Sequence, residues 1–101
     1  MVEYYEIAEF LKNFSDASRV KIVLALLEKE LSVNDIAEKV GMTQTAVSYQ
    51  LRILRDSRIV KHRREAQNIY YSIDDEHINK ILLTTQEHLE ERKSLWKLSI
   101  E

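Results

Sequence analysis

The chain has 101 residues, with no cysteine, no proline, one glycine and a formal net charge of −2 at neutral pH. This length predicts a single domain over residues 1–101, and the lack of cysteine excludes disulfides, thiolate metal ligands and a cysteine nucleophile. No apolar run approaches the about 20 residues that span a membrane, and the acidic start is unlike a secretory signal peptide. We therefore expect a cytoplasmic protein with no membrane partner.

The first two elements are predicted to be helices. Apolar residues at Ile7, Phe10, Leu11 and Phe14 recur at helical spacing over residues 3–14. A second helix is expected over about 17–28, capped by either of the polar residues 15 and 16. Its centre, residues 20–27, is apolar almost all round, which predicts that this helix is buried.

A helix-turn-helix is predicted over about residues 33–56. Ser32 can cap a short helix, Gly41 follows that helix where a left-handed residue is needed, and Thr43 can cap the next one. In the second helix, Val47, Leu51 and Leu54 form an apolar stripe.

The other side of this second helix carries side chains that suit base-edge and phosphate contacts in a major groove. An ordinary amphipathic surface helix is the alternative interpretation. The candidate DNA-binding residues are Thr43, Gln44, Thr45, Ser48, Tyr49 and Arg52.

Two strands over about residues 59–73 are predicted to form a β-hairpin wing, so the expected fold is mainly α with a small β-hairpin, a winged helix-turn-helix. Arg63 and Arg64 lie beside the hairpin tip, where they would meet phosphates or the minor groove. Residues 43–71 contain six basic and two acidic side chains, whereas the segments on both sides are acidic. This basic centre supports double-stranded DNA as a partner.

The last helix, over about residues 75–95, carries two pairs of possible metal ligands. Asp75 and His77 stand at its start, and His88 and Glu91 lie further along at i and i+3. Eleven residues place His88 about 16.5 Å beyond His77 and only about 20° around the axis, so the two histidines share a face but cannot reach one ion. Each pair is half of a tetrahedral site, and two antiparallel copies in a homodimer would complete two interfacial sites.

An apolar stripe beside these pairs is expected to pair across the two-fold axis; it consists of Ile78, Ile81, Leu82, Thr85 and Leu89. The alternative is a solvated helix face with scattered His and Glu. A metallohydrolase is disfavoured because four protein ligands would close the site, so no enzyme activity is expected. A winged helix that serves protein contacts is disfavoured by the polar stripe and the wing arginines.

Together these segments resemble the ArsR/SmtB family of dimeric winged-helix repressors over nearly the whole chain. Residues 14–27, 31–37, 42–52 and 63–71 are similar to the family's second helix, third helix, recognition helix and wing. The pattern of Asp75, His77, His88 and Glu91 is similar to that of the family's zinc sensors. Ser32 stands where thiolate sites begin with Cys, which disfavours arsenite, lead, cadmium and copper(I). Tyr49 replaces a frequent His, and Ala66 a frequent wing glycine.

The resemblance implies a repressor whose metal-free dimer binds an operator inverted repeat and whose Zn(II)-bound form releases it. Co(II) is expected to bind as a probe, and nickel is less well suited because the N-terminal segment supplies no further His. The alternative is a repressor of the same family whose last-helix residues are structural and whose signal is not a metal. The operator, the regulated gene, the choice among Zn, Co and Ni, and the role of the segment around Trp96 stay open.

Overall fold

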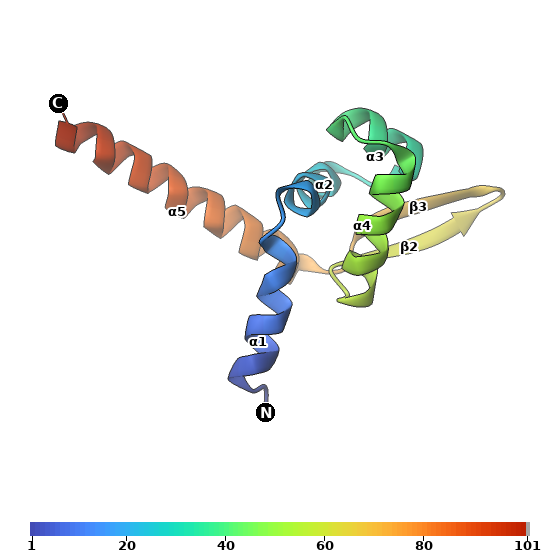
Figure 1. Ribbon diagram of the computed structural model, residues 1–101, viewed down its shortest axis with the longest axis horizontal. Helices are drawn as coiled ribbons and strands as arrows, with labels where there is room; N and C mark the ends of the chain where they lie inside the picture. The colour runs from blue at the N-terminus through green and yellow to red at the C-terminus, as the bar shows by residue number, and fades with distance from the viewer. Residues whose placement is uncertain (101) are drawn as a thin grey trace.

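The computed structural model describes the backbone of residues 1–100 and the side chains of residues 1–95. The described chain is mainly helical with one small antiparallel sheet, as predicted (Figure 1). In chain order the elements are α1 (Tyr4–Leu11), the 3-10 helix η1 (Lys12–Phe14), α2 (Ala17–Glu28), β1 (Leu31–Ser32), α3 (Val33–Val40), α4 (Gln44–Asp56), β2 (Val60–Glu65), β3 (Asn68–Ile73) and α5 (Glu76–Ile100).

Side-chain caps set the helix boundaries at the predicted positions. Asp16 accepts from the backbone N–H of residue 19 at 3.0 Å and begins α2, which decides between the two expected capping residues. Ser32 and Thr43 cap α3 and α4 in the same way. Gly41 ends α3 in the left-handed conformation at φ 71°, which only glycine adopts without strain.

The sheet has the strand order β1-β3-β2, and all neighbours are antiparallel. Strand β1 has only two residues and was not predicted from the sequence. The hairpin closes between Glu65 and Asn68, so its turn consists of Ala66 and Gln67. Ala66 has φ 56°, in the left-handed region that usually favours glycine. The turn of the wing thus adopts this conformation although it contains no glycine.

The hydrophobic core lies between α2, α3, α4, the sheet and the first turns of α5. The side chains of Ile22, Ile36, Val47, Leu51 and Leu54 are fully excluded from solvent. Tyr71 and Ile73 of β3 pack against this cluster, whereas Ile69, which is partly buried as they are, lies outside it. The core thus contacts one side of α4, and the opposite side of this helix faces solvent.

Helix α5 leaves the body of the molecule and extends well beyond it (Figure 1). The expected apolar stripe on this helix is divided, which corrects the prediction that it pairs as a whole with a second copy. Ile78 and Leu82 are buried in the core of their own chain, whereas Leu89 is 46% exposed and Thr85 is exposed. Every described side chain from residue 83 to 95 is exposed. The helix also runs to Ile100, five residues further than expected, while the side chain of Trp96 lies outside the described ones.

Within residues 1–100, no helix has both the length and the apolar character that crossing a bilayer requires.

Candidate DNA-binding surface and metal half-sites

The outer side of α4 presents the polar side chains that the sequence singled out. Thr45, Ser48 and Arg52 are exposed, as are Thr43 and Gln44 at the start of the helix. Tyr49 is also 63% exposed, although its ring is large and apolar. A helix held from one side by the core and lined on the other by short hydrogen-bonding groups and an arginine is suited to enter a DNA groove.

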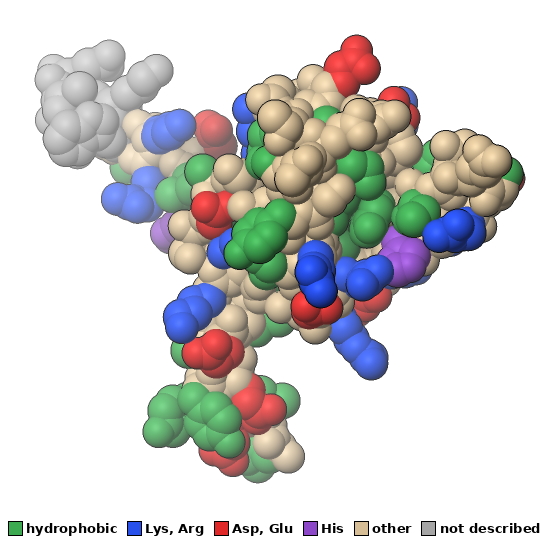
Figure 2. Space-filling model, turned by 45° about the vertical axis from the view of Figure 1, so that its right-hand side comes forward, with side chains coloured by type: hydrophobic (Ala, Val, Ile, Leu, Met, Phe, Trp, Pro, Cys, Tyr) green, Lys and Arg blue, Asp and Glu red, His purple; other side chains and the backbone are tan. Residues whose placement is uncertain are grey.

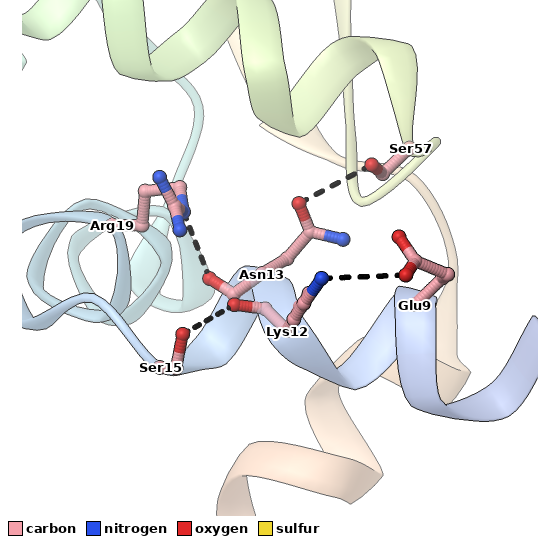
Figure 3. A pocket seen from close by; sticks show the side chains of 6 residues that line it. All are labelled: Glu9, Lys12, Asn13, Ser15, Arg19 and Ser57. Carbon is pink, nitrogen blue, oxygen red and sulfur yellow. Dashed lines mark hydrogen bonds and ion pairs between the residues drawn. The ribbon is translucent and has the colours of Figure 1, made fainter. Parts of the chain in front are cut away.

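A polar network fixes α4 relative to the N-terminal elements (Figure 3). Asn13, 8% exposed, accepts a hydrogen bond from the Ser57 hydroxyl just beyond α4, and its amide donates to the carbonyl of Phe10. Arg19 of α2 donates from Nε to the carbonyl of Asn13 and from Nη1 to the side-chain oxygen of Gln50 on α4. Buried polar groups are costly unless they are paired, so these bonds resist rotation of α4 against α2.

The two wing arginines have different surroundings. The Arg63 guanidinium donates from Nε and Nη2 to the Glu30 carboxylate at 2.9 and 2.7 Å and from Nη1 to Glu65 at 2.8 Å. It also lies over the Tyr70 ring. Hydrogen bonds from Arg63 lower the pKa of Glu30, and the two carboxylates raise the pKa of Arg63. Arg64, on the opposite face of β2, is exposed and has no ion pair among the described residues.

The structure adds two candidates that were not selected from the sequence. Arg55, near the end of α4, donates from Nη1 to Nδ1 of His62 on β2 at 3.0 Å. The spacing of Ser48, Arg52 and Arg55 at i, i+4 and i+7 was the available signal for Arg55. Nothing in the sequence reveals the contact with His62, because it depends on how the wing folds back toward α4.

At the start of α5, Asp75 and His77 lie together as predicted. The Asp75 carboxylate accepts from the backbone N–H of His77 at 2.9 Å and lies 3.2 Å from Nδ1 of its imidazole. Partial desolvation raises the pKa of Asp75, but the hydrogen bonds from His77 outweigh it and leave that pKa below its ordinary value. Both side chains are largely exposed, so oxygen and nitrogen donors here face outward.

The second pair, His88 and Glu91, lies further along the same uninterrupted helix, and both side chains are exposed. Because α5 is one helix from Glu76 to Ile100, the separation of about 16.5 Å expected between the two histidines applies. Among the described residues no group of three or more His, Asp or Glu side chains gathers around a possible metal position. One chain therefore offers two separate pairs of ligands.

An apolar groove of about 650 Å³ lies beside the first pair. Its walls come from α1, through Ile7, Phe10 and Leu11, and from α5, through Ile78 and Ile81. No residue of α1 is buried, and Ile7 and Leu11 are each about half exposed. In the described chain, α1 and α5 thus both present apolar side chains that nothing covers.

Comparison with known proteins identifies the family. Residues 16–62, from α2 into β2, match the sequence model described as "Bacterial regulatory protein, arsR family". The crystal structure of AntR, an antimony-specific transcriptional repressor, is 33% identical and superposes with a TM-score of 0.81 over 91% of this chain and 84% of that one. The chain belongs to the arsR family.

Two further similarities bear on the fold and the class of protein. A transcriptional repressor from Synechocystis, an SmtB homolog, is 42% identical over 85% of this chain and 65% of its own length. The solution structure of a homodimeric winged helix-turn-helix DNA-binding domain from Mycobacterium bovis is 28% identical, with a TM-score of 0.82 over 87% of this chain and 82% of that one. The winged helix-turn-helix fold is confirmed, and membership of a family of regulators confirms the prediction that the chain is not an enzyme. The chain spans less than two thirds of the length of the curated relative.

Proposed function

We propose that this arsR-family protein is a dimeric transcriptional repressor that binds operator DNA through α4 and the wing and is released by Zn(II) bound between two α5 helices. The homodimeric state of the M. bovis domain supports a dimer here. The uncovered apolar side chains of α1 and α5 supply a surface for it. A repressor acts where the DNA is, which keeps the cytoplasm as the proposed location.

The DNA-binding part rests on the exposed side of α4 and on Arg64. In a symmetric dimer, two such helices would enter successive major grooves about 34 Å apart, which suits an inverted-repeat operator. Ser48, Tyr49 and Arg52, with the threonines and Gln44 at the helix start, would meet base edges and phosphates. Arg64 would supply a phosphate contact from the wing. Arg63 would have to leave Glu30 and Glu65 to do the same, so we propose that it chiefly anchors the wing.

The observation that carries the metal proposal is the distance of 3.2 Å between the Asp75 carboxylate and Nδ1 of His77. Ligands bound at 2.0–2.1 Å in a tetrahedral site lie about 3.3 Å from one another, so this pair already has the spacing of one edge of a zinc site. His88 and Glu91 of a partner chain would supply the opposite edge. Two imidazoles and two carboxylates, with no thiolate in the sequence, suit Zn(II).

The start of α5 is joined to α4 by backbone hydrogen bonds, which offers a route for the response. The N–H of Asp74 donates to the carbonyl of Ile59 at 3.0 Å, and the N–H of Ile59 donates to the carbonyl of Leu54 in α4 at 2.9 Å. A bound metal supplies a centre that holds side chains of both chains in one geometry. Asp75 and His77, fixed in this way, would hold the base of α4 at a spacing that fits the operator poorly.

One observation favours the second candidate, a repressor of this family whose α5 residues are structural. Asp75 already accepts the backbone N–H of His77 and lies beside its imidazole, so it caps the helix without any metal. In that case, substitution of His77 would change the stability of α5 and not a metal response.

A Co(II) titration of the purified protein separates the two candidates. The metal-sensor proposal predicts an intense visible band of tetrahedral Co(II) without thiolate charge transfer, saturation at one ion per chain, and loss of the band on addition of Zn(II). Operator DNA must then weaken metal binding by the factor by which metal weakens DNA binding, typically about 1–3 kcal/mol of coupling. No band, or only the weak band of octahedral Co(II), would exclude the proposed site.

A further inference from the structure

The junction between α4 and the wing carries a pair of nitrogen-rich side chains from two elements. Arg55 of α4 donates to Nδ1 of His62 on β2, and both residues are exposed. The His62 ring also lies against the Tyr71 ring of β3, with centroids 5.6 Å apart. Figure 2 shows a histidine among Lys and Arg side chains on the side where the hairpin comes forward. The pair is therefore held in place and open to solvent.

The pair presents hydrogen-bond donors to the outside and no charged acceptor. Because His62 accepts at Nδ1, its proton is on Nε2, which points away from Arg55 and is free to donate. Arg55 uses one guanidinium nitrogen for this bond, and its remaining N–H groups have no carboxylate partner among the described residues. Arg63 differs, because Glu30 and Glu65 surround its guanidinium. A cluster of donors with one fixed positive charge favours an anion with several oxygens, such as a phosphate.

The position of the pair favours the DNA backbone as the source of such a phosphate. Arg55 continues the line of Ser48 and Arg52 along the outer side of α4, about 10 Å beyond Ser48. His62 lies on the same face of β2 as Arg64, because side chains alternate along a strand. The pair thus lies between the helix proposed to enter the groove and the arginine proposed to contact the backbone beside it.

We infer that Arg55 and His62 together bind one backbone phosphate of double-stranded DNA where the recognition helix meets the wing. This inference rests on the proposed DNA-binding function. Arg55 supplies the charge and a two-pronged donor, while His62 orients the guanidinium and adds its own N–H. The contact adds affinity that does not depend on base sequence.

The test measures the salt dependence of binding to a labelled duplex of arbitrary sequence of about 30 base pairs, long enough for two recognition helices one turn apart. The metal-free protein is compared with Arg55→Ala, His62→Ala and the double variant. Arg92→Ala serves as the matched control, because it removes the same charge from the far part of α5. Circular dichroism and sedimentation confirm that each variant keeps its fold and oligomeric state.

Loss of a phosphate contact reduces the steepness of the fall of log K with log salt by about 0.9 for each protomer. Arg55→Ala should therefore make the slope less steep by that amount, and Arg92→Ala should leave it unchanged. His62→Ala should weaken binding severalfold. The double variant should weaken binding by less than the product of the two single-variant factors, because both side chains serve one phosphate. The shared site would be overturned by an unchanged slope for Arg55→Ala, by unchanged affinity for His62→Ala, or by losses of binding free energy that add strictly in the double variant. If the wild-type chain binds duplex without salt dependence, or not at all, the proposed DNA-binding function itself fails.

Discussion

The two-chain metal site makes a prediction about mixed dimers that no single-chain site shares. His77→Ala and His88→Ala each remove one ligand from both sites of a homodimer, so each variant alone should lose the tetrahedral Co(II) band. In a mixed dimer, both substitutions fall on the same site, and the other site keeps all four ligands. Random assembly of an equal mixture yields about half mixed dimers, so the mixture should recover about one quarter of the wild-type absorbance.

The assay is Co(II) absorption on the two variants refolded together, with each variant alone as reference. His62→Ala is the matched control, since it removes the third histidine of the chain and should keep the full band. Mixed dimers purified through two different tags should show about half of the wild-type band. A mixture that stays at zero would refute the pairing of one chain's His77 with the other chain's His88. A full band in either single variant would show that its histidine is not a ligand.

Four further predictions address the fold and the wing. Leu51→Ala should lower the free energy of unfolding by about 2–5 kcal/mol in urea denaturation, because its side chain is fully buried; a loss below about 1 kcal/mol would contradict that burial. Gly41→Ala should cost about 1 kcal/mol in the same assay: a Cβ meets nothing within 4 Å, so only the left-handed φ opposes it. Arg64→Ala should reduce the salt slope of DNA binding by about one per protomer, whereas an equal reduction by Arg63→Ala would contradict its anchoring role. Arg63 lowers the pKa of Glu30 in the folded state. The stabilising contribution of Glu30 is therefore present above the pKa that this carboxyl has in the unfolded chain, and it is lost as the pH falls through the pKa of the folded state. In an acid titration, Glu30→Gln should lose less stability than the wild-type chain.

The helix-turn-helix was predictable because local chemistry determines it. Ser32, Gly41 and Thr43 each have a side chain or a backbone freedom that fits one position of a helix boundary, and those boundaries are found where expected. The division of α4 into a buried and an exposed side follows from periodicity alone. In the same way, Asp75 and His77 are close because two residues at a helix start have few alternatives.

Features that depend on distant contacts were not predictable. Strand β1 exists because Leu31 and Ser32 happen to lie beside β3, and two residues carry no strand pattern of their own. The pairing of Arg63 with Glu30 joins residues 33 positions apart. The prediction that the apolar stripe on α5 pairs as a whole with a second copy was wrong for a related reason. Periodicity reveals which residues share a face but not how far along the helix the core extends.

The division of α5 gives the two ligand pairs different mechanical positions. Asp75 and His77 stand where the helix is anchored, next to the buried Ile78 and to the backbone bonds that reach α4. His88 and Glu91 stand on the part whose described side chains are all exposed, which the core of its own chain does not hold. An ion shared between the pairs would tie the anchored end of one helix to the unsupported part of the other. The recognition helices of both chains would then be restrained together, which is what a response transmitted to a two-fold symmetric operator requires.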